Sequence, residues 1–365
     1  SGRARRMRVT EIDDATGRQI SSVATDPSIY ENFAGPPREN HISLLPAAPG
    51  RAVVVYADLP LLSDDAVAWA PYVGAFASPW PGQELIYRSP SLSGYVIDTA
   101  ISQQSMIGES LYDFYSGPTW RWDQVNSLYV KLYNGTLESG DPQNGEAVNA
   151  LAIQNSDGGW EIVQFQTAEV IGTQEWKLTG LLRGQRGTEQ QMRNPVSAGA
   201  RILVLDATLS QLGLSLSQFS ATFNYLWGPA GKSISDPSYQ SGTFSFAGVG
   251  MMPFSPAEVR FSWAAVDLGI SWKRRDRNLS ADSWDQVEIP MSETLELYDL
   301  EILSADGSAV VRSFTDLPAA AATYTAAMQA ADYPSGIPNP LIVRVYQKSS
   351  VVGRGNPATQ QLWTR

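Results

Sequence analysis

In residues 179–192, TGLLRGQRGTEQQM, two arginines alternate with glycines and a Thr-Glu pair follows at once. The seven residues at the centre of this stretch are Arg183, Gly184, Gln185, Arg186, Gly187, Thr188 and Glu189. Glycine backbone and basic side chains can bind phosphate, but a Walker loop needs the pattern GxxxxGK[ST], and this stretch has no lysine. We therefore interpret it as a structural turn whose arginines hydrogen-bond carbonyls and carboxylates. Thr188 with Gln191 fits a capping box for a short helix starting at Glu189.

Three pairs of carboxylates lie close together in the sequence: Asp13 with Asp14, Asp64 with Asp65, and Glu293 with Glu296. Glycosidase chemistry needs two carboxyl groups that face each other, one of them protonated. Adjacent residues of a strand point to opposite faces, so sequence proximity does not supply this geometry. We expect solvated turns at the aspartates, and ion pairs from the glutamates to Arg274, Arg275 or Arg277. The sequence predicts no catalytic residue and no enzyme activity.

Metal and nucleophile chemistry is limited by composition. The chain has no cysteine and a single histidine, His41, which excludes disulfides, thiolate metal sites and a cysteine nucleophile. A Ser-His-Asp triad would have to use His41. The oxygen-rich loops 141–146 and 155–157 suit calcium in ligand type, but neither has EF-hand spacing and turn chemistry explains both. We expect no metal and no cofactor.

Tryptophans beside cations offer a different chemistry. Trp120 and Trp122 flank Arg121, Trp80 lies in the loop 78–82, and Trp272 is followed by three basic residues. Exposed tryptophans stack on sugar rings, which makes Trp80, Trp120 and Trp122 candidate glycan or partner contacts. The alternative is a core position with arginines over the ring faces. We favour this structural interpretation for Trp120, Trp122 and Trp272.

The whole chain has 365 residues and a net charge of −11. This acidity argues against general nucleic-acid binding and against docking on an anionic membrane. No run of 18 apolar residues indicates a membrane span. Abundant aromatic residues together with many glycines and prolines favour sheets over helices.

Short alternating segments separated by turns predict a mainly β, antiparallel protein. A strand at 5–12, a turn at 13–17 and a proline-bearing link make up an N-terminal region, 1–37. A β-rich domain over 38–250 is predicted from strands at 52–56, 68–77, 84–88, 94–98, 128–132, 148–154, 160–166, 176–182 and 201–205. Its clearest hairpin turns at 156–159, and 206–250 is expected to be irregular.

A second β domain is predicted over 251–365. Strands at 258–264, 268–273, 286–289, 293–303, 309–314 and 341–347 have the number and spacing of an immunoglobulin-like or fibronectin type III-like β-sandwich. One helix interrupts them at 325–332, with Thr325 as its N-cap.

Several phrases taken together resemble a family of phage tail proteins that includes the baseplate hubs of gene transfer agents and siphophages. They are LTGLLRGQRGTE (178–189), FASPWPG (76–82) with IYRS (86–89), NGTLES (134–139), the run 271–303, and VRVYQKSSVVGRGNP (343–357). They span essentially the whole chain and follow the order of the family.

The resemblance implies a trimeric tail-tip hub at the distal end of the tail of a virion or virion-like particle. It implies contacts with other baseplate proteins and a part in host attachment or DNA delivery. Fuller members carry an upstream TIM-barrel-like domain, for which we find no strand–helix repeat here, so this chain is expected to correspond to the C-terminal part. A cell-wall hydrolase activity is therefore not carried over. The competing hypothesis is a carbohydrate-binding module that recognises a host cell-surface glycan.

Overall fold

A computed structural model describes residues 5–26, 50–140, 149–277 and 289–364. The chain divides into two compact units, Ser1–Ala47 and Ala48–Arg365, and each is considered by itself. The protein is mainly β, and every paired strand in the described ranges is antiparallel to its neighbour. None of the helices in these ranges has the length and apolar character needed to cross a membrane.

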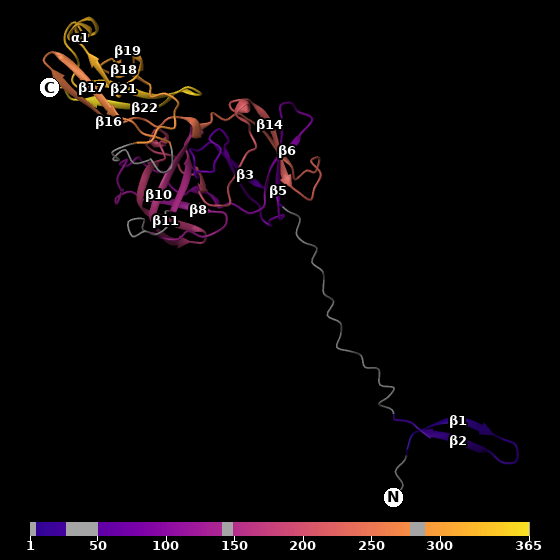
Figure 1. Ribbon diagram of the computed structural model, residues 1–365. Helices are drawn as coiled ribbons and strands as arrows, with labels where there is room; N and C mark the ends of the chain where they lie inside the picture. The colour runs from indigo at the N-terminus through magenta and orange to yellow at the C-terminus, as the bar shows by residue number, and fades with distance from the viewer. Residues whose placement is uncertain (1–4, 27–49, 141–148, 278–288, 365) are drawn as a thin grey trace. The chain divides into compact units, whose positions relative to one another are not determined.

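The described part of the first unit is a single hairpin of β1 (Met7–Asp13) and β2 (Gln19–Ala24) (Figure 1). Its turn is closed locally, since the Asp13 carboxylate accepts a hydrogen bond from the Ala15 N–H and Arg18 pairs with Asp14. The strand and turn predicted here from sequence are both present. The proline-bearing link and His41 lie outside the described residues.

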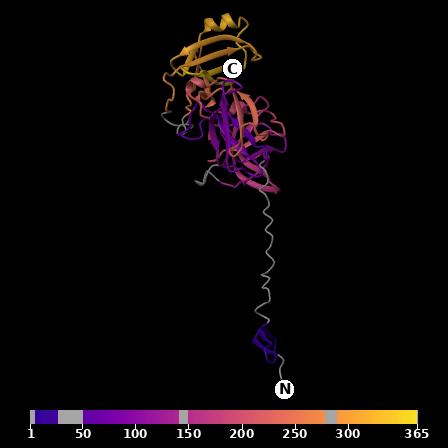
Figure 2. The same ribbon diagram turned by 90° about the vertical axis from the view of Figure 1, so that its right-hand side faces the viewer.

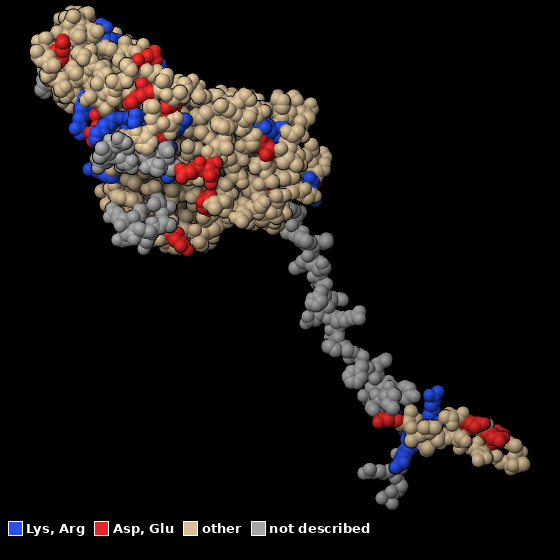
Figure 3. Space-filling model, viewed as in Figure 1, with Lys and Arg blue, Asp and Glu red and all other residues tan. Residues whose placement is uncertain are grey.

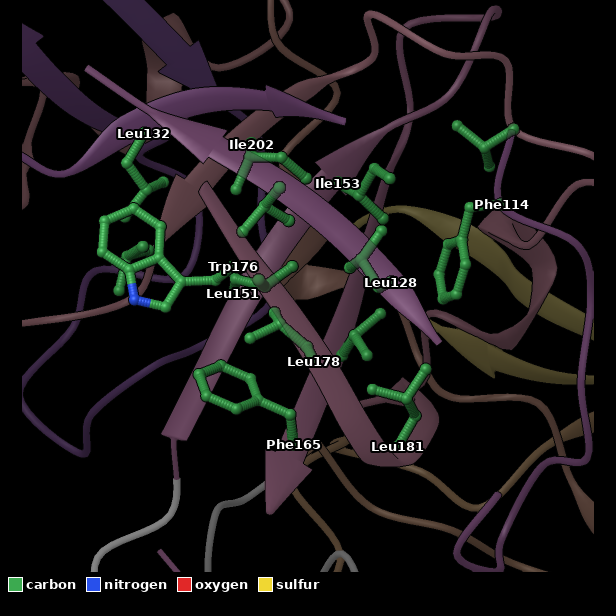
Figure 4. Packing of buried hydrophobic residues seen from close by; sticks show 14 residues of the cluster. Phe114, Leu128, Leu132, Leu151, Ile153, Phe165, Trp176, Leu178, Leu181 and Ile202 are labelled. Carbon is green, nitrogen blue, oxygen red and sulfur yellow. The ribbon is translucent and has the colours of Figure 1, made fainter. Parts of the chain in front are cut away.

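The centre of the second unit is a closed antiparallel barrel in the order β10-β11-β8-β7-β12-β9. Its strands are β7 (Ile107–Ser110), β8 (Leu128–Leu132), β9 (Asn149–Gln154), β10 (Trp160–Gly172), β11 (Glu175–Gln185) and β12 (Arg201–Val204). Inward-facing side chains such as Leu151, Phe165 and Leu178 fill the interior (Figure 4). Closure leaves this sheet without a free edge.

Two further sheets follow the barrel in layers, and among the described residues only the first packs directly against it. One contains β13 (Ser210–Gln211), β4 (Tyr72–Phe76) and β3 (Val53–Ala57). The other contains β15 (Gln240–Phe244), β14 (Phe223–Pro229), β5 (Glu84–Ser89) and β6 (Val96–Ile101). Alternation along β3 sends Val55 and Ala57 to the barrel side and Val54 and Tyr56 to the other sheet. The sheet containing β3 is therefore a middle layer.

The expectation that 206–250 is irregular is wrong, because β13, β14 and β15 all lie there. Serine and glycine around these strands weakened the sequence signal, although β14 itself is rich in aromatic residues that favour strands. β14 is paired on both sides, with β5 and with β15.

The C-terminal region is a two-layer sandwich. One sheet contains β16 (Ala257–Ala264), β17 (Asp267–Lys273) and β20 (Ala321–Tyr324). The other has the order β19 (Val310–Leu317), β18 (Tyr298–Leu303), β21 (Leu341–Ser349) and β22 (Gly353–Leu362). This three-plus-four arrangement is that of a fibronectin type III-like sandwich, as expected, and β20 and β22 are strands that the sequence did not reveal.

The sandwich has its own buried cluster, which includes Trp272, Tyr298 and Val343. The structural interpretation of Trp272 is confirmed. Helix α1 (Ala326–Asp332) begins at Thr325, whose hydroxyl accepts a hydrogen bond from the Met328 N–H as predicted. It lies at the outer end of the sandwich in both views (Figures 1 and 2). The domain limits at 250 and 251 stay a prediction, because Ala48–Arg365 is one compact unit.

Candidate functional site at the junction of barrel and sandwich

The motif that opened the sequence analysis contains a fully buried ion pair. The Arg183 side chain on β11 and the Glu161 side chain on β10 have no exposed surface. Arg183 donates from Nε to Oε1 at 2.5 Å and from Nη2 to Oε2 at 2.8 Å, and the Gly184 N–H adds a third hydrogen bond to Oε1. This bidentate geometry satisfies both charges inside the protein. Sequence reasoning missed Glu161, although a glutamate within the apolar run around it was a usable signal.

The same guanidinium fastens the segment between β7 and β8, residues 111–127, which we term the display loop. Nη1 of Arg183 donates to the Tyr115 carbonyl at 2.8 Å, and the guanidinium carbon lies 3.8 Å from the centre of the Phe114 ring. Backbone bridges pair Phe114 with Val196 and Asp123 with Leu181. The loop is therefore held to the barrel along its length, and Arg183 is its central support.

Asp123 stabilises the far end of the display loop. Its buried carboxylate accepts hydrogen bonds from the Val125 and Asn126 N–H groups and from the Asn126 amide. Burial alone would raise the pKa of Asp123, but these hydrogen bonds hold the pKa below its usual range. The side chains that remain exposed on the loop include Tyr112, Tyr115, Trp120 and Val125.

Two glycines of the motif are required by geometry. Gly184 and Gly187 have φ of 59° and 74°, where a side chain is strained. A Cβ on Gly187 would lie 2.3 Å from the Phe254 ring, and a Cβ on Gly184 would lie 2.8 Å from the Glu189 backbone. The close approach of Phe254 brings the segment that leads into the sandwich against the turn.

The predicted capping box is wrong. A 3₁₀ turn does occur at Glu189–Gln191, but Thr188 forms no side-chain cap. Instead its hydroxyl donates to the Gln185 carbonyl and accepts from the Ile162 N–H. The Gln191 side chain turns to Asn155. The Thr188 hydroxyl and the Gln191 amide therefore hydrogen-bond to other segments of the barrel and not to the ends of the 3₁₀ turn.

Glu189 joins the motif to the sandwich. Its Oε1 accepts from Arg275 Nη1 at 2.6 Å and from the Trp120 indole N–H at 3.0 Å. Arg275 follows β17, and its guanidinium also lies over the ring of Phe254. Two further contacts cross the junction, from Asn356 to the Gly187 carbonyl and from Gln190 to the Pro357 carbonyl. The motif thus connects three parts of the fold: barrel, display loop and sandwich.

Arg186 differs from Arg183. It is half-buried, and within the described ranges it forms no hydrogen bond or ion pair. The expectation that both arginines hydrogen-bond within the chain therefore holds for Arg183 and is wrong for Arg186. Arg186 lies one residue beyond the end of β11 and has φ of 58°, so it does not share the strand position that buries Arg183.

The candidate tryptophans occupy three different environments. Trp120 is 48% exposed, so the structural interpretation as a core residue is wrong for it. Trp122 is half-buried. Trp80 is also half-buried and packs against the apolar cluster of the outer sheets. The structure does not bring Trp80 and Trp120 into one cluster.

The candidate carboxylate pairs lie in turns or in ion pairs with arginines. Asp64 and Asp65 are exposed in a turn. Glu296 pairs with Arg274, and Glu293 with Arg277, as the sequence predicted. In the described ranges no group of three or more acidic or histidine side chains is placed to hold a metal ion. Asn155 uses its side chain to close the hairpin turn, accepting from the Asp157 and Gly159 N–H groups, and the loop 141–146 lies outside the described residues.

A pocket of about 640 Å³ lies beside the motif, lined by residues such as Asp58, Trp160, Arg201 and Asn356. Two of its polar side chains are engaged within the chain. Asp58 accepts from the Gly248 and Val249 N–H groups, and Asn356 donates to Gly187. Burial raises the pKa of Asp58 while those hydrogen bonds oppose the rise. A second carboxylate, Asp157, also lines the pocket, where it pairs with Arg193 at 2.7 Å.

Comparison with known proteins adds one family match. Residues 105–203 match a family described as Rcc01698-like, C-terminal. The matched segment coincides with the barrel and contains the display loop, Glu161, and the motif through Glu189. A search of curated proteins returns no match.

Solved structures give only distant likenesses. The central fibronectin-III array of RIM-binding protein matches at 12% identity over 86% of this chain and 96% of that one, with a TM-score of 0.19. A tetra-tandem repeat in the extending region of a large adhesion protein matches at 12% identity over 86% and 73%, with a TM-score of 0.16. A β-1,2-glucanase from Parabacteroides distasonis matches at 10% identity over 87% and 36%, with a TM-score of 0.17. These TM-scores are too low to support an argument about function.

Proposed function

We propose that the chain is a structural, non-catalytic component of a phage or gene-transfer-agent tail tip. In this role it belongs to the baseplate hub that closes the tail tube and contributes to host attachment or DNA delivery. The proposal rests on the resemblance of its sequence phrases to phage tail proteins. Its place would be the distal end of the tail, beside other baseplate proteins.

One observation in the fold supports an assembly role. Arg183 of the motif forms a buried ion pair with Glu161, and the same guanidinium donates a hydrogen bond to the display loop. That loop exposes Tyr112, Tyr115 and Val125 to solvent. Exposed aromatic and apolar side chains on a rigid support are typical of contact surfaces between proteins.

The resemblance further implies a closed trimer about the tail axis. A threefold ring needs heterologous interfaces, in which one patch meets a different patch of the next copy. The display loop is the patch that we assign to this interface. This arrangement requires no substrate turnover by any residue of the chain.

Imaging of intact particles tests the location and the copy number. Specific labelling should find this chain at the distal end of the tail, in three copies. Labelling along the tube or on the capsid would refute the hub assignment.

Substitution tests the contact surface. Tyr115→Ala and Val125→Asp should reduce incorporation into particles while thermal unfolding stays unchanged. Val351→Asp is the matched control, because Val351 is also exposed but lies on the sandwich. If all three variants were incorporated into particles equally well, the display loop would not be part of the interface.

A carbohydrate-binding role is the second candidate, and the exposure of Trp120 favours it. Tyr115 and Tyr112, exposed on the same loop, would extend a surface for stacking sugar rings. Trp120→Ala should then abolish glycan-array binding, whereas Trp80→Ala, at a side chain packed on the core, should not. An array without any binding by the unaltered chain would eliminate this role.

A further inference from the structure

The N-terminal hairpin has one apolar face and one charged face. In the register of the two strands Met7 lies opposite Ala24, Val9 opposite Ser22, and Ile12 opposite Ile20. A register irregularity between Val9 and Glu11 compensates for their odd spacing and returns Ile12 to the face of Val9. The apolar side chains of this face are exposed.

The hairpin also has open edges. Within the described residues β1 pairs only with β2, so the outer edge of β1 presents unpaired backbone groups. A lone two-stranded hairpin is marginal in water, whereas three or more strands with an apolar face reach independent stability. A stable sheet therefore needs strands beyond these two.

The sequence of β1 is complementary to itself when reversed. Arg6 and Arg8 precede Val9, and Glu11 and Asp13 follow it. Arg6 extends the ladder, because its carbonyl accepts a hydrogen bond from the Thr25 N–H. If a second β1 runs antiparallel along the open edge, Arg6 meets Asp13 and Arg8 meets Glu11 of the other copy. In the same register the two apolar residues Met7 and Ile12 face each other across the copies.

The hairpin itself does not satisfy these charges. Arg8 lies opposite Val23 and Glu11 opposite Ser21 on β2. Neither Arg8 nor Glu11 forms an ion pair in the described ranges. In Figure 3 basic side chains colour the open end of the hairpin, and acidic side chains colour the region of its turn. Two copies aligned in parallel would bring like charges together, and an antiparallel pair brings opposite charges together.

We propose that two copies of this chain pair through the outer edges of their β1 strands. The product is a four-stranded antiparallel sheet in the order β2-β1-β1-β2. Its two-fold axis passes at Val9, because the irregularity after Val9 makes Thr10 and Glu11 share one position of the ladder, opposite Arg8 of the other copy.

Met7, Val9, Ile12 and Ile20 of both copies then share one face, whereas Val23 lies on the other face with Arg8. This two-fold contact goes beyond the tail-tip assignment. A closed ring of three copies has no two-fold axis, so the contact joins copies of different rings or copies that are not assembled into a ring.

Charge reversal tests the register on the full chain by analytical ultracentrifugation at low salt. Arg8→Glu sets two carboxylates opposite each other, and Glu11→Arg sets two guanidinium groups opposite each other, so each variant should weaken the two-fold association more than tenfold. The double variant R8E/E11R should restore it. An equimolar mixture of the two single variants should also restore it, because each supplies the charge that the other lacks. Neither change alters an ion pair inside the described hairpin.

A cross-link locates the contact independently of any other association. The chain has no cysteine, so Val9→Cys introduces a single thiol at the proposed axis. Mild oxidation should give a covalent dimer with Val9→Cys and none with Thr16→Cys, at the turn of the same hairpin. Equal cross-linking of the two variants would overturn the pairing. It would also be overturned if the association were equally strong for the unaltered chain, the charge-reversed variants and their mixture. The tail-tip assignment would stand or fall separately by particle imaging.

Discussion

Two glutamates in two regions of the fold are buried to the same extent but differ in their partners. Glu161 in the barrel and Glu84 in the outer sheet both have no exposed surface. Glu161 accepts two hydrogen bonds from Arg183 and one from Gly184. Neither carboxylate oxygen of Glu84 has a hydrogen-bond partner among the described residues, and burial raises the pKa of Glu84 to about 7. The barrel supplies its glutamate with a counter-charge, whereas the outer sheet favours a protonated one.

The largest expected effect comes from breaking the paired site. Arg183→Met removes the cation and leaves Glu161 buried without a counter-charge, which should destabilise the protein by about 3–5 kcal/mol. Urea unfolding at pH 7 measures this change. A second substitution, Glu161→Leu, should recover much of the loss, since an apolar pair replaces the buried ions. A cost no larger than that of removing the exposed Arg193–Asp157 pair, below about 1 kcal/mol, would contradict the role of Arg183.

The next largest effect on the free energy of unfolding is expected from removing the charge of Glu84, which has no counter-charge among the described residues. Because the pKa of Glu84 in the folded state lies above its ordinary value of 4.5, the folded protein holds this proton more tightly than the unfolded chain. Stability should therefore fall as the pH rises from 4.5 to 7, and the loss is complete above pH 7. Its upper limit is about 3 kcal/mol.

Glu84→Gln should remove this loss, so that the variant is more stable than the unaltered chain at pH 8 and similar to it at pH 5. Chemical unfolding of both proteins at the two pH values gives the difference. Burial also raises the pKa of Asp98. Because Asp98 is the same in both proteins, the difference between them gives the contribution of Glu84 alone. If the free energy of unfolding changed equally with pH in the two proteins, ionisation of Glu84 would cost the folded protein little.

An intermediate effect is expected at the junction. Glu189→Gln keeps the side-chain shape but removes the charge that Arg275 contacts at 2.6 Å. Both side chains are largely buried, so the expected cost is about 1.5–3 kcal/mol. Hydrogen exchange should show faster opening where the sandwich meets the barrel, with unchanged protection inside each. Uniformly faster exchange throughout the chain would contradict a local role.

The smallest expected effect is at Arg186, and it tests the difference between the two arginines of the motif. Arg186→Ala should change stability by no more than about 0.5 kcal/mol, because the described structure gives Arg186 no ion pair or hydrogen bond. Alanine retains the Cβ, so the backbone strain at φ of 58° is unchanged. A loss comparable to that of Arg183→Met would contradict this expectation and show that the half-buried Arg186 side chain stabilises the fold.

Sequence periodicity predicted most strands of the barrel and of the sandwich. Where it failed, the composition of the surrounding segment hid the strand. Strand β14 contains Phe, Tyr and Trp, which favour strands, but it lies in a segment rich in serine and glycine, and it is hydrogen-bonded on both sides. The capping box of Thr188 failed for a different reason, because Ile162 and Gln185 from β10 and β11 bind its hydroxyl.

For the candidate site, the sequence by itself determined the residue types and the turn. Gly184 and Gly187 are where a chain must take positive φ, and the absence of a lysine argues against a Walker loop. Only the tertiary structure decided which arginine is buried, because the partner of Arg183 lies 22 residues away on the adjacent strand. It also decided that Glu161 has a counter-charge while Glu84 favours its proton. Burial and hydrogen-bond partners set the free energy of a charge, and both depend on residues that only folding brings together.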